Sequence, residues 1–120
     1  MKKICLCLFL LGCLIFCGGP FKGIASDDYY VVTGCGGIGG ATYNGNYYYY
    51  RSYNGKNLYK KTEGGIGRIW YSTTYTRWYI TAYLSSEEGW AKLGDTKLPD
   101  GQYTPWGYNP RDTATVTLGE

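Results

Sequence analysis

The amino-acid sequence predicts an all-β protein of six to eight short antiparallel strands in a compact meander, arranged as a small barrel or as two packed sheets. Beyond the first 26 residues, Tyr, Thr, Val, Ile and Trp dominate, and these residues favour strands. Glycine recurs about every eight to twelve residues, at the spacing of turns between short strands. Apolar residues do not recur at i, i+3, i+4 and i+7, as they would in an amphipathic helix.

The N-terminal segment has the features of a secretory signal peptide. Two lysines near the start are followed by the apolar run Ile4–Phe16 and then by small residues. We therefore expect residues 1–26 to be removed on secretion, leaving one extracellular Tyr/Gly-rich β-domain at 27–120. Lipidation at Cys13 or Cys17 is the competing interpretation, but apolar residues continue after the first and a bulky residue precedes the second.

The charge of the expected mature domain does not favour a nucleic-acid or membrane partner. The chain has 12 Lys and Arg and 9 Asp and Glu. Lys2, Lys3 and Lys22 lie in the signal segment, so nine basic residues balance nine acidic ones in 27–120. A net charge of zero predicts no electrostatic binding to nucleic acid, nor to a membrane after signal cleavage. The absence of His excludes Ser-His-Asp and Cys-His catalysis and His-ligated metal sites.

The first half of the domain contains three predicted strands separated by glycine-containing turns. Two Asn-Gly pairs lie ten residues apart, and Asn-Gly supplies the positive φ angles that tight hairpin turns require. A glycine-rich stretch, Gly34–Gly40, follows the first strand and is expected to be flexible. The three strands are Tyr29–Thr33, Asn46–Ser52 and Lys56–Thr62.

The clearest strand is Arg77–Leu84, in which two sets of residues alternate. Ile66–Tyr71 is its expected partner, joined to it by a short polar loop of hairpin length. The set expected to face the core is Trp78, Ile80, Ala82 and Leu84. The set expected on the other face is Arg77, Tyr79, Thr81 and Tyr83.

Three further extended segments are expected downstream, at Glu88–Leu93, Tyr103–Trp106 and Ala114–Leu118. The last alternates Ala, Val and Leu with Thr, which fits either a terminal edge strand or a frayed tail. Aliphatic residues are scarce in the whole domain, whereas the chain has 15 Tyr and 4 Trp. Most of these aromatic rings must therefore pack in the core, and only a minority can line a binding surface.

The order of several short motifs resembles a small secreted β-module found in extracellular proteins. The motifs are Val32-Thr33-Gly34-Cys35-Gly36, Asn44-Gly45-Asn46-Tyr47, Asn54-Gly55-Lys56 with Tyr59, Ile69-Trp70-Tyr71-Ser72, Arg77-Trp78-Tyr79-Ile80, Pro99 and Trp106. The resemblance covers about residues 30–107 and implies an all-β fold. The module has no established activity, so the resemblance implies no functional residue. The chain departs from the pattern at Cys35, where a small residue is usual, and in the tyrosine-rich run Tyr47–Tyr50.

The acidic residues do not form a pattern typical of catalysis or metal binding. Glycoside hydrolysis needs two carboxylates that face each other, whereas Glu87 and Glu88 are adjacent and lie in an expected solvated turn. Asp95 and Asp100 lack the spacing of a calcium loop. We therefore expect a protein that is not an enzyme, with no catalytic residue, no metal and no cofactor.

Sugar binding is a function that the tyrosines favour, because exposed aromatic rings stack on the faces of sugar rings. The candidate ligand-binding residues are Tyr48, Tyr50, Tyr79 and Tyr83. Alternation places the first two on one face of their strand and the last two opposite the core-facing Trp78. The competing interpretation is that outward tyrosines only form cross-strand pairs.

A structural role is the first functional expectation: a secreted β-domain of an extracellular matrix or surface layer, of the shell, cuticle or coat type. A carbohydrate-binding, lectin-like module is the alternative, and matrix polymers or polysaccharide are the expected partners. Cys35, the single cysteine of 27–120, is either a small buried residue or a thiol that links two chains. Self-association through this thiol or through edge strands stays open.

Overall fold

The computed structural model describes residues 29–61, 66–84, 86–92, 94 and 96–119. The predicted signal peptide, 1–26, lies outside the described residues. The elements in chain order are β1 (Tyr29–Thr33), β2 (Gly36–Gly37), the short 3-10 helix η1 (Gly40–Tyr43), β3 (Gly45–Tyr53), β4 (Lys56–Lys61), β5 (Arg68–Ser72), β6 (Arg77–Thr81), β7 (Gly89–Lys92), β8 (Gly101–Trp106), β9 (Pro110–Arg111) and β10 (Ala114–Leu118).

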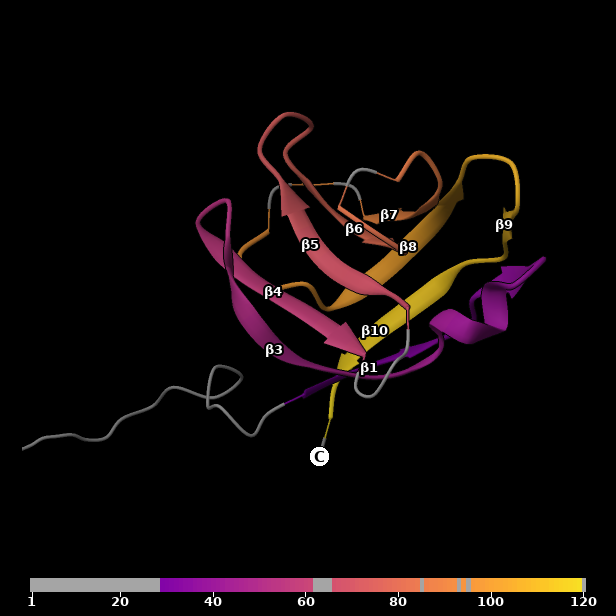
Figure 1. The fold of residues 1–120 in the computed structure, drawn as a ribbon, viewed down its shortest axis with the longest axis horizontal. Coiled ribbons are helices and arrows are strands. Elements are labelled where there is room, and N and C mark those ends of the chain that lie inside the picture. The colour runs from indigo at the N-terminus through magenta and orange to yellow at the C-terminus, as the bar shows by residue number, and fades with distance from the viewer. Residues whose placement is uncertain (1–28, 62–65, 85, 93, 95, 120) are drawn as a thin grey trace, which may run out of the picture.

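Eight of these strands close into an antiparallel barrel (Figure 1). Around the barrel the order is β1, β3, β4, β5, β6, β7, β8 and β10, after which β10 pairs with β1. The strands therefore follow one another as a meander, which confirms the predicted fold class and selects the barrel from the two predicted architectures. β2 and β9 form a separate two-stranded sheet beside the barrel. The glycine-rich stretch Gly34–Gly40, which we expected to be flexible, contains β2 and the first residue of η1.

The last strand, β10, has the predicted bounds but not the predicted environment. Val116 pairs with Val32 of β1 on one side and with Gly101 of β8 on the other. The prediction of an edge strand or a frayed tail was therefore wrong, because both sides of β10 are hydrogen-bonded in the closed barrel. Closure leaves the barrel strands without a free edge for pairing with another chain.

The strand predicted over Arg77–Leu84 ends earlier, at Thr81. Beyond it the chain turns, because the backbone N–H of Tyr83 donates to Ser86 Oγ (2.9 Å) and the N–H of Ser86 donates to the Tyr83 carbonyl (3.2 Å). Tyr83 thus lies in the β6–β7 connection. Within β6 the predicted core face is confirmed, since Trp78 and its companion Ile80 are almost fully buried.

A β-bulge interrupts the alternation of the tyrosine run in β3. Tyr49 pairs with Tyr59, and Arg51 pairs with Leu58, so Tyr50 is the extra residue between them. A bulge shifts the faces of the residues that follow it. As a result Tyr49 and Tyr50 are both exposed, by 45% and 51%, although strict alternation would place them on opposite faces.

The barrel interior is filled largely by aromatic rings. An eight-stranded barrel has an interior just wide enough for side chains to fill. Seven of the thirteen buried core residues are Tyr or Trp, as the aliphatic-poor composition predicts. The core comprises Tyr30, Val32, Cys35, Tyr47, Tyr59, Ile69, Tyr71, Trp78, Ile80, Trp90, Tyr103, Ala114 and Val116.

Polar tips of these buried rings donate hydrogen bonds to backbone carbonyls in the connections. A buried donor without a partner costs about 1–3 kcal/mol, so these bonds are a condition for burying Tyr and Trp. The bonds run from Tyr47 Oη to the Tyr43 carbonyl (2.7 Å), from Tyr103 Oη to Pro99 (2.5 Å), from Trp78 Nε1 to Thr96 (2.9 Å) and from Trp90 Nε1 to Asp112 (3.0 Å).

Replacing Tyr103 by Phe tests the contribution of one such bond. Tyr103→Phe leaves the buried Pro99 carbonyl without its donor, and we expect the free energy of unfolding to fall by about 1–2 kcal/mol. Urea denaturation measures the change. The control is Tyr50→Phe at an exposed position, for which we expect a change within about 0.5 kcal/mol. Equal midpoints for Tyr103→Phe and the unchanged protein would contradict the argument.

Stability should also fall at alkaline pH. Burial raises the pKa values of Tyr47 and Tyr103 above 10.0, the ordinary value for tyrosine. The folded state therefore keeps phenol protons that the unfolded chain releases, so the stability contribution is complete below pH 10 and is lost as the pH rises above it. We expect the urea midpoint to fall above pH 10, with the phenolate absorbance of the buried tyrosines appearing only on unfolding. A folded protein in which all 15 tyrosines titrate near pH 10 would refute this expectation.

Candidate functional site

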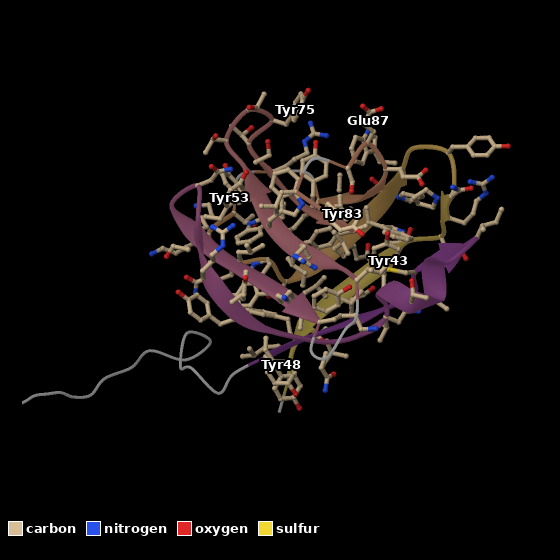
Figure 2. All side chains as sticks on the ribbon, viewed as in Figure 1. Tyr43, Tyr48, Tyr53, Tyr75, Tyr83 and Glu87 are labelled. Carbon is tan, nitrogen blue, oxygen red and sulfur yellow. The ribbon has the colours of Figure 1, made fainter. Side chains whose placement is uncertain are left out.

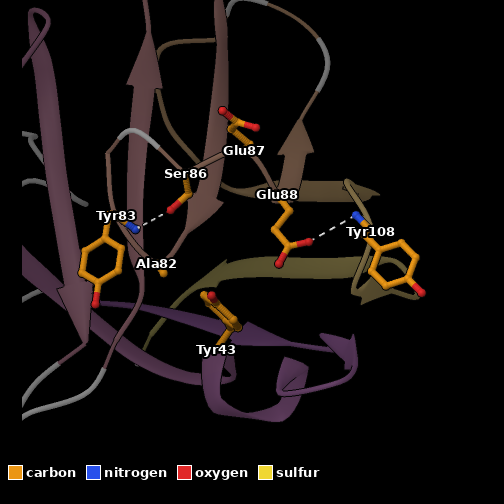
Figure 3. A pocket seen from close by; sticks show the side chains of 7 residues that line it. All are labelled: Tyr43, Ala82, Tyr83, Ser86, Glu87, Glu88 and Tyr108. Carbon is orange, nitrogen blue, oxygen red and sulfur yellow. Dashed lines mark hydrogen bonds between the residues drawn. The ribbon is translucent and has the colours of Figure 1, made fainter.

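An open cleft of about 610 Å³ lies at the barrel end where β6 and β8 finish and β3 and β7 begin. Three separate parts of the chain line it: η1, the β6–β7 connection and the β8–β9 connection (Figure 3). The described lining residues are Tyr43, Ala82, Tyr83, Ser86, Glu87, Glu88 and Tyr108. The cleft therefore combines three phenol rings, one hydroxyl and two carboxylates.

Tyr43 is positioned by the barrel core. The hydroxyl of the buried Tyr47 donates to the Tyr43 carbonyl (2.7 Å), and the Tyr43 ring packs against the ring of Trp90 with centroids 5.1 Å apart. Gly67 permits the approach of the Tyr47 hydroxyl, because a Cβ there would lie 2.4 Å from it. Burial, and then the charge of Glu88, raise the pKa of Tyr43, so its phenol stays neutral at physiological pH.

Glu88 is fixed in the cleft by the β8–β9 connection. Its Oε1 accepts hydrogen bonds from the backbone N–H groups of Asn109 (3.0 Å) and Tyr108 (3.2 Å), and its Oε2 accepts one from Asn109 Nδ2 (3.1 Å). These bonds, those from Asn109 foremost, lower the pKa of Glu88, so it is a carboxylate at neutral pH. Gly107, at φ +99°, brings the turn this close, since a Cβ there would lie 2.2 Å from the Glu88 Cβ.

The outer rim of the cleft consists of exposed rings. Tyr83 is 62% exposed and Tyr108 is 81% exposed, on opposite sides of Glu88 in Figure 3. Glu88 points toward Tyr43 and Tyr108, whereas the carboxylate of Glu87 points away from these rings. The rings and the Glu88 carboxylate are therefore open to a ligand from solvent.

Of the four tyrosines predicted to bind a ligand, Tyr83 is the one that lines this cleft. Tyr48 packs against Tyr29 with ring centroids 5.3 Å apart, and Figure 2 shows it on the side of the barrel away from Glu87. Tyr50 lies beneath the ammonium of Lys60, 4.5 Å from its ring centroid. The structure thus distributes the predicted residues over separate parts of the surface.

Tyr79, the fourth predicted residue, is on the outer face of β6 but is only 5% exposed. Its ring stacks on Trp70 (5.2 Å between centroids, 25° between planes) and packs against Trp106 (5.2 Å). Tyr75 covers it from a third side, at 6.4 Å. Tyr79 is therefore the centre of an aromatic cluster on the outer face, where its ring is covered by protein.

Sequence reasoning did not identify Tyr43, Glu88 and Tyr108 as a group. They lie in connections far apart in the chain, and only barrel closure brings these connections to one end. Glu88 was assigned to a solvated turn, which describes its position but not its hydrogen bonds. A usable signal is that Tyr43 and Tyr108 each stand beside Asn and Gly turn residues, where a ring is held outside a strand.

Cys35 is buried in the core, with 5% of its surface exposed, and its thiol is free in the described part of the chain. The Asn44 side chain bridges its backbone, accepting from the Cys35 N–H (2.9 Å) and donating to the Cys35 carbonyl (3.2 Å). Burial raises the pKa of the thiol to about 12. This environment favours the small buried residue over the thiol that links two chains.

The described residues contain no group of three or more Cys, Asp and Glu side chains placed to hold a metal ion. They also contain no helix with the length and apolar character needed to cross a membrane.

The Cys35 thiol should be inert in the folded protein. Because thiolate is the reactive form and its formation is suppressed by burial, we expect a disulfide reagent to label Cys35 only after denaturant is added. The denatured protein serves as the control for complete reaction. Rapid stoichiometric labelling under native conditions would show that the thiol is accessible and would restore the expectation of a link between chains.

Comparison with known proteins found no protein family, no curated protein and no solved structure that matches the chain. The resemblance to a small secreted β-module therefore stays an expectation that rests on the residue pattern.

Proposed function

We propose that the protein is a secreted, non-enzymatic component of an extracellular matrix or surface layer that binds polysaccharide in the end cleft. One observation carries the proposal: Tyr43, Tyr83 and Tyr108 line one open hollow together with the Glu88 carboxylate. Aromatic rings offer apolar faces to the C–H face of a sugar ring, and a fixed carboxylate accepts hydrogen bonds from sugar hydroxyls. The cleft thus has both kinds of group that hold a sugar unit.

The chemistry of the two carboxylates favours binding over hydrolysis. A glycosidase needs a general acid, whose pKa is raised so that it carries a proton at neutral pH. Hydrogen bonds from Asn109 lower the pKa of Glu88 instead. Glu87 points away from the rings of the cleft, so the two carboxylates do not face each other across it. These features support a ligand-binding role without catalysis.

The distribution of the remaining tyrosines supports a place in a matrix. Exposed phenols can stack on and hydrogen-bond to neighbouring polymers from several directions. Since the barrel strands have no free edge, association with other molecules would use these side chains rather than strand pairing. The exposed tyrosines outside the cleft, from 45% to 61%, are Tyr49, Tyr50 and Tyr75.

Polysaccharide retention tests the proposal with a matched pair of variants. We expect the mature protein to be retained on at least one of chitin, cellulose and an acidic mucopolysaccharide. Tyr83→Ala should weaken retention up to about tenfold, because one aromatic contact contributes about 0.5–1.5 kcal/mol. Tyr75→Ala is the control: Tyr75 is 61% exposed, like Tyr83 at 62%, but lies outside the cleft.

The outcomes separate the parts of the proposal. If no polysaccharide retains the protein, the binding function is wrong. If both variants weaken retention equally, the binding surface is not the cleft. A protein that binds glycans but stays soluble in secretions, and is missing from washed matrix, would be a lectin rather than a matrix component.

A further inference from the structure

We infer that the end cleft selects amino sugars, that is, sugar units with a free, protonated amine, over neutral or acidic sugars. The inference rests on the proposed function and specifies its ligand class. It follows from three features of the cleft: a carboxylate held in the charged form, aromatic rings around that carboxylate, and a lining without cations among its described residues.

The Glu88 carboxylate has a place for an ammonium group. Oε1 already accepts two N–H groups, from Tyr108 and Asn109, whereas Oε2 accepts one hydrogen bond from the described residues, donated by Asn109 Nδ2. A carboxylate oxygen has two lone pairs, so Oε2 can accept a second donor. An ammonium is the donor that gains most there, because hydrogen bonds between two ionised groups are the stronger class.

The phenol rings toward which Glu88 points, those of Tyr43 and Tyr108, also favour a positive charge beside this carboxylate. The face of an aromatic ring carries partial negative charge and attracts cations within about 6 Å, with about 0.5–1 kcal/mol at exposed sites. After burial, the charge of Glu88 raises the pKa of Tyr43, which agrees with Glu88 pointing toward this ring in Figure 3. A sugar bound between the rings can therefore meet the carboxylate and the ring faces together.

The surrounding charges discriminate against an acidic sugar. Cations on the neighbouring elements are already engaged by backbone carbonyls: Arg111 donates to the carbonyls of Tyr108 (2.7 Å) and Pro110 (3.0 Å). Lys61 donates to the carbonyls of Thr42, within η1, and of Asn44, just after it, at 2.7 and 2.8 Å. Neither lines the cleft. A uronic acid would therefore meet the Glu88 carboxylate with no cation in the described lining to balance its charge, and the two negative charges would repel each other.

Two oligosaccharides that differ only in the amine test the inference. Titration calorimetry at slightly acidic pH compares a glucosamine oligomer with an N-acetylglucosamine oligomer of the same length. We expect the free-amine oligomer to bind at least about tenfold more tightly, and a glucuronic-acid oligomer to bind most weakly. Equal affinities for the first two would overturn the inference and leave the proposed function standing. If none of the three oligomers binds and no polysaccharide retains the protein, the proposed function itself fails.

Two substitutions at adjacent glutamates test whether the selectivity comes from the Glu88 carboxylate. Glu88→Gln should make the affinities for the free-amine and acetylated oligomers nearly equal. Glu87→Gln removes the same charge one residue away and should retain most of the preference for the free amine. Thermal unfolding of both variants shows whether the β8–β9 connection is intact. If Glu88→Gln melts as the unchanged protein does and keeps the full preference, the inference is wrong.

The pH dependence provides a test that needs no variant. Raising the pH through the pKa of the sugar amine removes its charge, while Glu88 stays ionised and Tyr43 stays neutral because its pKa is raised. Besides Glu88 and Tyr43, the titratable residues that line the cleft are Tyr83, Tyr108 and Glu87. Those on the elements packed around it are Arg111, Lys61, Asp112 and Cys35. We expect the affinity for the glucosamine oligomer to fall to that for the acetylated one, which should not change. A preference that survives amine deprotonation would overturn the inference.

Discussion

The structure depends on burying aromatic rings whose polar tips must keep hydrogen bonds. Aliphatic residues are too few to fill an eight-stranded barrel, so Tyr and Trp fill most of the space. Each buried Oη or Nε1 then needs an acceptor, but the carbonyls of the barrel strands already accept the hydrogen bonds between strands. Tyr47, Tyr103 and Trp90 instead donate to carbonyls in the connections at the barrel ends. Packing of the core and conformation of the loops are therefore coupled.

The same interactions position the residues that line the cleft. Tyr47 holds the backbone of Tyr43, and Trp90 both packs against the Tyr43 ring and donates to the carbonyl of Asp112, beyond β9. The elements on two sides of the cleft are thus anchored to the core rather than free to move with solvent. Glu88, two residues before Trp90, anchors the third side by accepting hydrogen bonds from Tyr108 and Asn109. The cleft is made of loops, but it acquires the rigidity of the barrel through these bonds.

The sequence was informative where a local pattern decides structure, and uninformative where closure decides it. Alternation identified Trp78 and Ile80 as core residues, because period-2 patterning acts within one strand. It could not place β10 between β1 and β8, which depends on the register of all the barrel strands together. Alternation correctly put Tyr79 on the outer face, but its burial comes from Trp70 and Trp106 on other strands. The cleft could not be predicted from the sequence either, because its residues lie in connections that only barrel closure brings together.

Tyrosine rather than phenylalanine is what lets one residue type serve both the core and the surface. A phenylalanine ring has no polar tip, so it is best buried completely, whereas a tyrosine is stable at any depth at which its hydroxyl finds a carbonyl or water. The described tyrosines accordingly range from 0% exposed at Tyr47 to 81% at Tyr108. The deeply buried ones lie in strands and fix the fold, while the exposed ones of the cleft lie in connections. A change of ligand preference at Tyr83 or Tyr108 would therefore leave the packing of the barrel intact.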